Sequence, residues 1–154
     1  MAKKLAIIAS KGTLDGAYPP FLLASTAVAL GFEVKIFFTF YGLQLLNKNL
    51  NLKVSPLGNP AMPMPVPVPS IVQVIPGLEW FATWMMKRKL KQKGVASVEQ
   101  LRDICVETGV DLIACQMTVD LFDFDNADFI DGISSGGAAT YLEFAGDADV
   151  SLYI

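Results

Sequence analysis

Short apolar runs alternate with helical stretches along most of this chain, and this alternation restricts the possible folds more than any other feature of the sequence. The run at 34–40 is nearly continuous in apolar residues and rich in β-forming side chains, which is typical of a strand covered on both faces. Similar runs predict strands at 5–10, 110–115 and 150–154, and a weaker strand at 130–134. Because short crossovers favour parallel pairing, we predict an α/β fold, a three-layer sandwich with a mainly parallel sheet of about five strands.

The starts of the helices are marked between these runs. Ser97 and Gln100 form a capping box at the start of one helix. We predict three further helices, over 19–30, 41–47 and 138–145. Pro19 and Pro20 open the first of them. A chain of 154 residues, 53% of them hydrophobic, buries roughly two thirds of its unfolded surface, so we predict a single domain over residues 1–154.

Residues 56–94 interrupt this alternation, and we predict that they form an insertion in the domain. Seven of the nine prolines fall between Pro56 and Pro76, and several of them alternate with apolar residues. Proline at every second position is incompatible with a helix or an inner strand, so the first part of the insertion is predicted to be an extended, polyproline-like segment. The second part carries aromatic and basic side chains and is predicted to be an amphipathic helix.

Three interpretations of this second part remain open. A membrane span is disfavoured, because the unbroken apolar stretch is too short for a hydrocarbon core of about 30 Å. An interfacial helix would contact an anionic membrane surface or an acidic partner through its neighbouring aromatic and basic side chains, namely Trp80, Trp84, Lys87, Arg88 and Lys89. Alternatively, the segment is a flap that covers the domain or packs between copies; so much apolar surface predicts a homo-oligomer.

Composition argues against several classes of function. The chain has no histidine, which excludes His-based triads and imidazole metal sites, and we expect no metal ion. A net charge of −3 argues against nucleic-acid binding. The glycine patterns of phosphate-binding and dinucleotide-binding loops are absent, so we expect no cofactor. Two cysteines are too few for a disulfide scaffold, and we expect a cytoplasmic protein with at most a peripheral contact at the inner face of the membrane.

Cys115 is the strongest candidate for a chemical role. It lies at the carboxyl end of the strand predicted at 110–115, the edge where open α/β sheets place their ligands. Thr118 is placed to cap a following helix, and a thiol near a helix N-terminus is favoured in its thiolate form. We therefore expect an ionised, accessible nucleophile at Cys115. The alternative is a buried, inert cysteine.

Cys105 and two loops are weaker candidates. Cys105 lies on the apolar face of the helix that begins at Ser97, so core packing is expected, although a role as a second thiol for Cys115 stays open. Small residues ahead of a helix leave backbone N–H groups free to bind an anion. Two loops at the same sheet edge have such residues: Gly12, Thr13, Gly136 and Gly137. An ordinary turn explains each of these loops equally well.

Several familiar motifs run from one end of the chain to the other, at residues 12–15, 17–20, 36–43, 87–94, 112–117 and 136–142. The Phe-Phe-Thr-Phe block at 37–40 and the Ala-Cys-Gln-Met block at 114–117 are the most specific. With these motifs the chain resembles the DsrE/DsrF/DsrH-like family of sulfur-relay proteins, in the branch often labelled peroxiredoxin-like. The resemblance implies a compact, usually oligomeric α/β protein that carries sulfane sulfur as a persulfide or thiosulfonate on a cysteine, here Cys115.

The resemblance implies a sulfur carrier or sulfurtransferase-like protein, with sulfur donor and acceptor proteins or small sulfur compounds as its partners. A true peroxiredoxin site is excluded, because the motif Pro-x-x-x-Thr/Ser-x-x-Cys is absent around Cys115. Whether the chain is an enzyme stays open. The alternative function is a non-catalytic interaction module that docks on a membrane surface or an acidic partner through residues 80–93. A redox sensor would require a bond between Cys105 and Cys115.

Overall fold

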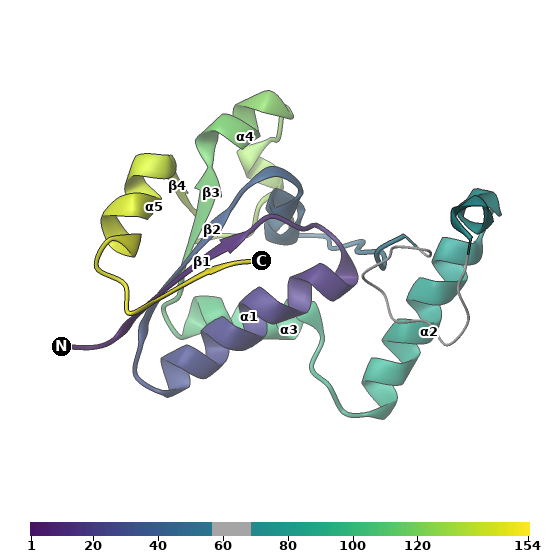
Figure 1. Ribbon diagram of the computed structural model, residues 1–154, viewed down its shortest axis with the longest axis horizontal. Coiled ribbons are helices and arrows are strands. Elements are labelled where there is room, and N and C mark those ends of the chain that lie inside the picture. The colour runs from purple at the N-terminus through teal and green to yellow at the C-terminus, as the bar shows by residue number, and fades with distance from the viewer. Residues whose placement is uncertain (57–68) are drawn as a thin grey trace.

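A parallel sheet of five strands forms the centre of the protein (Figure 1). The computed structural model describes residues 1–56 and 69–154. The strands are β1 (Lys4–Ala9), β2 (Glu33–Phe38), β3 (Asp111–Cys115), β4 (Ser134–Gly136) and β5 (Val150–Tyr153). They lie in the order β4-β3-β2-β1-β5, and every neighbouring pair is parallel. The carboxyl ends of the strands therefore meet at one edge of the sheet.

Helices cover both faces of the sheet, which confirms the predicted three-layer α/β sandwich. α1 (Leu14–Ala29) and α3 (Val98–Glu107) pack on one face, and α5 (Ala138–Ala145) lies on the other (Figure 1). The shorter elements are α4 (Gln116–Leu121) and the 3-10 helices η1 (Phe40–Leu46), η2 (Ser70–Val74) and η3 (Asn126–Asp128). α4 follows β3 directly and η1 follows β2, so both lie at the carboxyl edge of the sheet.

The side chains of β3 show how the two faces differ. Leu112 and Ala114 belong to the larger core, which α1 and α3 cover, whereas Ile113 and Cys115 point to the opposite side. The buried cluster on that opposite side is smaller and consists of Ala6, Phe37, Ile113, Cys115, Tyr141 and Phe144. Cys115 therefore lies on the more thinly covered face of the sheet.

The ends of α3 follow the sequence signals. The Ser97 hydroxyl accepts a hydrogen bond from the Gln100 N–H at 3.2 Å, and the Gln100 side chain accepts one from the Ser97 N–H at 2.9 Å. The predicted capping box is thus confirmed. At the other end, Gly109 has a left-handed backbone, with φ 84°, and turns the chain from α3 into β3.

α1 begins at Leu14 rather than at the predicted Pro19. Thr13 is its N-cap, and the Thr13 hydroxyl accepts a hydrogen bond from the Gly16 N–H at 3.2 Å. Both prolines lie inside the helix, where their missing N–H groups leave carbonyls of the preceding turn without a helical donor. The cap and the burial of Pro20 against the core offset this loss, so the helix extends to the cap.

The strand predicted at 130–134 is wrong, because pairing with β3 begins only at Ser134. Gly132 has a left-handed backbone, with φ 82°, and turns the chain just before the strand. Ile130 and Ile133 pack against the larger core as part of this loop. Their burial explains why a loop has the apolar pattern of a strand.

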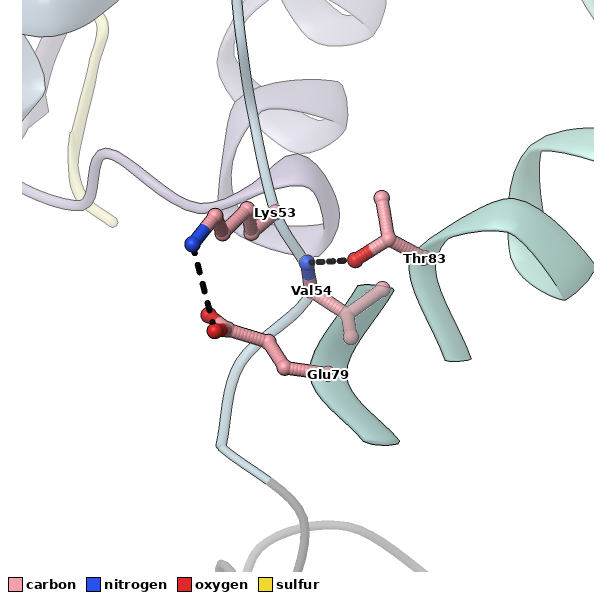
Figure 2. A network of polar contacts seen from close by, with 4 residues as sticks. All are labelled: Lys53, Val54, Glu79 and Thr83. Carbon is pink, nitrogen blue, oxygen red and sulfur yellow. Dashed lines mark hydrogen bonds and ion pairs between the residues drawn. The ribbon is translucent and has the colours of Figure 1, made fainter. Parts of the chain in front are cut away.

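The insertion contains a helix that projects from the rest of the domain, α2 (Leu78–Gln92) (Figure 1). Figure 2 shows how its first half is attached. The Thr83 hydroxyl accepts a hydrogen bond from the Val54 N–H at 3.1 Å, and the Lys53 ammonium pairs with the Glu79 carboxylate at 3.3 Å. Thr83 is buried and the ion pair is exposed, so the hydrogen bond is the stronger attachment.

The predicted polyproline-like segment falls mainly on residues 57–68, which lie outside the described residues. Within the described part of the insertion, Pro69 is the N-cap of η2. In residues 1–56 and 69–154, no helix has both the length and the apolar composition that crossing a membrane requires. The division of the chain into one domain with an insertion at 56–94 stays a prediction.

Candidate functional site

Cys115 is the last residue of β3 and also the N-cap of α4. It therefore ends its strand at the carboxyl edge of the sheet, as the sequence predicts. The following helix begins at Gln116, so the prediction that Thr118 caps it is wrong. The physical reason is the burial of Thr118, whose hydroxyl bonds inside the fold instead.

The Thr118 hydroxyl joins the carboxyl ends of β2 and β3. Its oxygen accepts a hydrogen bond from the Phe40 N–H at 3.3 Å and lies 3.2 Å from the Thr39 hydroxyl. Phe40 has a left-handed backbone, with φ 49°, which is uncommon for a residue with a Cβ atom. The bond from its N–H supports this conformation and fixes the turn from β2 into η1, next to the strand that ends at Cys115.

The Cys115 side chain is buried, with 4% of its surface exposed. It belongs to the same buried cluster as Phe37 of β2 and Tyr141 and Phe144 of α5. This burial differs from our expectation of an accessible thiol. It arises because α5 packs its two buried side chains against this face of the sheet.

A chain of exposed polar side chains crosses the end of β3 beside this thiol. Gly136 is the register partner of Cys115 in the pair of β3 and β4. The Ser135 hydroxyl donates a hydrogen bond to Gln116 Oε1 at 2.6 Å, and Gln116 Nε2 donates one to Asp120 Oδ1 at 2.8 Å. The sequence does not indicate this contact. Gln116 directly follows the cysteine, but only the register of β4 brings Ser135 to it.

The structure brings Gly136 and Gly137 close to Cys115: Gly136 ends β4 beside it, and Gly137 follows at the start of α5. Gly137 is the N-cap of α5 and has no side chain that could bond the first N–H groups of the helix. A Cβ atom at Gly137 would meet no atom within 4 Å, so the space around it is open. An anion-binding role for these two glycines stays a prediction.

Gly12 and Thr13 follow β1, and β2 separates β1 from β3. They line a separate hollow of about 290 Å³ in which the candidate thiol takes no part. The Thr13 hydroxyl accepts hydrogen bonds from the Gly16 N–H and, at 3.3 Å, from the Ser55 hydroxyl. Partial burial acts to raise the pKa of Asp15, but hydrogen bonds from the Ser55 hydroxyl and N–H lower it below its ordinary value. The structure therefore does not bring this loop together with the cysteine.

Cys105 is fully buried in the larger core, where its thiol donates to the Phe21 carbonyl oxygen at 3.5 Å. Burial raises the pKa of Cys105 to about 11. The expected core packing is confirmed. Cys105 lies on the face of the sheet that carries Leu112 and Ala114, so the sheet separates it from Cys115. Both cysteines are free, and the structure does not bring the two thiols together.

α2 presents the predicted contact residues to solvent. Trp80 is 69% exposed and Trp84 44% exposed, and the Arg88 guanidinium lies 5.3 Å from the centroid of the Trp84 ring. Lys87 and Lys89 are exposed as well. The aromatic residues occupy the first half of the helix and the basic ones the second half. α2 stands apart from α4 and β3 (Figure 1), so this surface is separate from the candidate thiol.

Comparisons with known proteins extend over the whole chain. A family model described as the DsrE/DsrF/DrsH-like family matches residues 1–153. The chain is 62% identical over 156 residues to the sulfur carrier protein DsrE2 of Allochromatium vinosum, with 99% of this chain and 98% of that protein covered. It is 29% identical over 157 residues to the uncharacterized protein YrkE of Bacillus subtilis, with 99% and 97% covered.

The crystal structure of the ychN protein from E. coli has the same fold. The two structures superpose with a TM-score of 0.55 over 99% of both chains. At 15% sequence identity this likeness shows the fold alone. Together, the match of the family model and the 62% identical relative give the conclusion that this chain belongs to the DsrE/DsrF/DrsH-like family.

Proposed function

We propose that this protein is a sulfur carrier that holds sulfane sulfur on Cys115. The observation that carries the proposal is the 62% identity, over almost the whole chain, to a relative named a sulfur carrier protein. The choice of residue is supported by the position of Cys115 at the carboxyl end of a parallel strand, where open α/β sheets place their ligands.

The proposed reaction moves one sulfur atom from thiol to thiol. The Cys115 thiolate attacks the sulfane sulfur of a donor persulfide, R–S–SH, so that a new S–S bond forms, the S–S bond of the donor breaks and the thiolate R–S⁻ leaves. The proton of the donor persulfide stays with the transferred sulfur, and no oxidant or reductant is consumed. The thiolate of an acceptor then repeats the step on loaded Cys115.

Cys105 is the less suitable thiol for this reaction. Burial raises the pKa of Cys105 to about 11, so near neutral pH it stays protonated, and the thiolate is the nucleophile. Cys115, in contrast, precedes the first turn of α4, and its strand partner Gly136 precedes α5. Cys115 thus lies at the edge of the sheet where open α/β folds bind their ligands, whereas Cys105 lies in the core.

Sulfur loading can be measured by intact mass. The purified protein is incubated with inorganic polysulfide, desalted and weighed by mass spectrometry. The wild type and Cys105→Ala should gain the mass of one sulfur atom, and Cys115→Ser should gain none. Equal loading of Cys115→Ser and the wild type would show that another residue carries the sulfur or that the protein is not a carrier.

We also propose an anionic membrane surface as a contact for α2. Its exposed tryptophans, followed by basic side chains, have the chemistry of an interfacial helix. The wild type should float with vesicles of anionic lipid, whereas Trp80→Ser/Trp84→Ser should not. Neither protein should float with zwitterionic vesicles. Leu22→Ser/Leu23→Ser is the matched control, because it removes two exposed apolar side chains from α1. Equal flotation of both double variants would contradict this contact.

The same apolar surface gives a competing proposal, a cytoplasmic homo-oligomer in which copies cover each other's α2. Donor and acceptor would then be proteins or small compounds that carry sulfane sulfur. Light scattering after size exclusion separates the two uses of α2. Loss of oligomers in Trp80→Ser/Trp84→Ser assigns the surface to self-association, whereas a wild type that is monomeric at all concentrations contradicts the homo-oligomer.

A further inference from the structure

A sulfur carrier must bring its thiol to a second molecule, and this inference rests on that proposed function. Cys115 is 4% exposed, and its neighbours in the buried cluster are apolar. A loaded thiol has one more sulfur atom than a free thiol, and protein interiors are packed too densely to accept an added atom without movement. Part of the cover over Cys115 must therefore move at each loading and unloading step.

The movable part of this cover is the unit formed by β4 and α5. β4 has three residues and lies at an edge of the sheet, and α5 has eight residues. α5 buries only Tyr141 and Phe144. Gly136 and Gly137 join the two elements, and glycine gives the backbone more freedom than other residues do. Small elements with little buried surface open at a lower free-energy cost than the core does.

A hydrogen bond between two side chains fastens this unit to the end of β3. Ser135 directly precedes Gly136, the register partner of Cys115, and Gln116 directly follows Cys115. The Ser135 hydroxyl donates to Gln116 Oε1 at 2.6 Å. Gln116 Nε2 donates to Asp120 Oδ1 at 2.8 Å, so both ends of the Gln116 amide are held. The bond thus links β4 to α4 directly beside the buried thiol.

The geometry points to the pair of Gln116 and Ser135 as a latch that controls access to Cys115. Both side chains are exposed, so water competes for their groups and the latch can open at a small cost. The two are positioning residues: they act through the placement of β4 and α5 and take no part in the sulfur transfer. The pairing of β4 with β3 and the packing of Tyr141 on Phe37 also hold this unit, so opening of the latch lowers the cost of moving it away from the thiol, and closing it helps to shield a loaded sulfur.

The rate at which iodoacetamide alkylates Cys115 tests the latch. It is measured in the full chain by peptide mass spectrometry. Gln116→Leu and Ser135→Ala each remove the latch bond and should raise the rate about threefold to tenfold, the range that follows from the net strength of one hydrogen bond. The double variant should gain little more than either single variant, because both changes remove the same bond.

Cys105 serves as an internal control, because it is fully buried in the core on the other face of the sheet. A variant that weakens the whole fold raises the alkylation rate of both cysteines, whereas an open latch raises the alkylation rate of Cys115 alone. Ser134→Ala is the matched variant, since the Ser134 hydroxyl also bonds β4 to β3, at 2.7 Å from an oxygen of Asp111, but at the amino end of β3. In Ser134→Ala the rate of Cys115 alkylation should stay within about twofold of the wild-type rate.

Three results would overturn the assignment: an unchanged Cys115 rate in the latch variants, a parallel rise at Cys105, or an equal rise in Ser134→Ala. The carrier proposal and the latch are tested by separate measurements, because alkylation of Cys115 needs no sulfur donor. If Cys115→Ser still loads sulfur while Gln116→Leu alkylates faster, the carrier proposal fails and the latch stands. If loading depends on Cys115 but the alkylation rates do not respond, the latch fails and the carrier proposal stands.

Discussion

Replacement of Thr118 by valine tests whether the hydroxyl network at the ends of β2 and β3 stabilises the fold. Valine has almost the shape of threonine but has no hydroxyl group. In the wild type the fully buried Thr118 oxygen accepts the Phe40 N–H at 3.3 Å and lies 3.2 Å from the Thr39 hydroxyl. The change leaves that N–H without its acceptor and removes a support from the left-handed backbone of Phe40.

A buried donor without a partner costs about 1–3 kcal/mol. We therefore expect Thr118→Val to lower the free energy of unfolding by about 2 kcal/mol, or the melting temperature by about 4–8 °C for a chain of this size. Urea unfolding followed by far-UV circular dichroism measures the first quantity, and scanning calorimetry measures the second. Thr39→Val keeps the bond from the Phe40 N–H, so it should cost less, about 1 kcal/mol.

Thr108→Val is the matched control for this change. The Thr108 hydroxyl also makes a hydrogen bond, to the Ile104 carbonyl oxygen at 2.7 Å, but at an exposed site. Its loss should change the free energy of unfolding by no more than about 1 kcal/mol. If Thr118→Val costs no more than Thr108→Val, the reasoning about the buried hydroxyl network is refuted.

Three further predictions concern other parts of the fold. Because burial raises the pKa of Cys105 from 9.0 to about 11, the wild type should lose stability as the pH rises through that range, and urea titrations should show a weaker loss in Cys105→Ala. Thr83→Val should loosen α2 and speed tryptic cleavage in its basic half, whereas Glu79→Gln, which removes an exposed ion pair, should be cleaved at the wild-type rate. Gly42→Ala should lower the free energy of unfolding by more than about 2 kcal/mol, because its Cβ would overlap a carbonyl oxygen of β1. The control Gly137→Ala should have the melting temperature of the wild type, and equal melting temperatures of the two variants would contradict this prediction.

The regular part of the fold can be predicted because its signals are local. β1, β2 and β3 are apolar runs, since strands buried on both faces lack polar alternation. β5 lies at an edge of the sheet and is mostly exposed, but its β-forming residues still mark it as a strand. β4 has no such signal: Ser134 and its two successors become a strand only by pairing with β3. The predicted start of α1 at Pro19 is wrong for a related reason. The prolines at 19 and 20 suggest a first turn, but the Thr13 cap and the buried side chains after it determine where the helix begins.

The candidate site could be predicted only in part. The place of Cys115 follows from the sequence, because it ends an apolar run. Its burial does not follow, because it depends on how α5 packs its side chains against the sheet. The bond between Ser135 and Gln116 spans 19 positions and depends on strand register, which a run of small residues does not specify.

Because Cys105 and Cys115 lie on opposite faces of the sheet, the backbone of β3 acts as a wall between them. A thiol within reach of a persulfide can attack its inner sulfur, form a disulfide and release hydrogen sulfide, which empties the carrier before delivery. The sheet between the two cysteines keeps the Cys105 thiol from attacking a persulfide on Cys115. In the proposed carrier the sulfur atom therefore leaves Cys115 only when a thiol of another molecule attacks it, so the arrival of the acceptor determines when the sulfur is released.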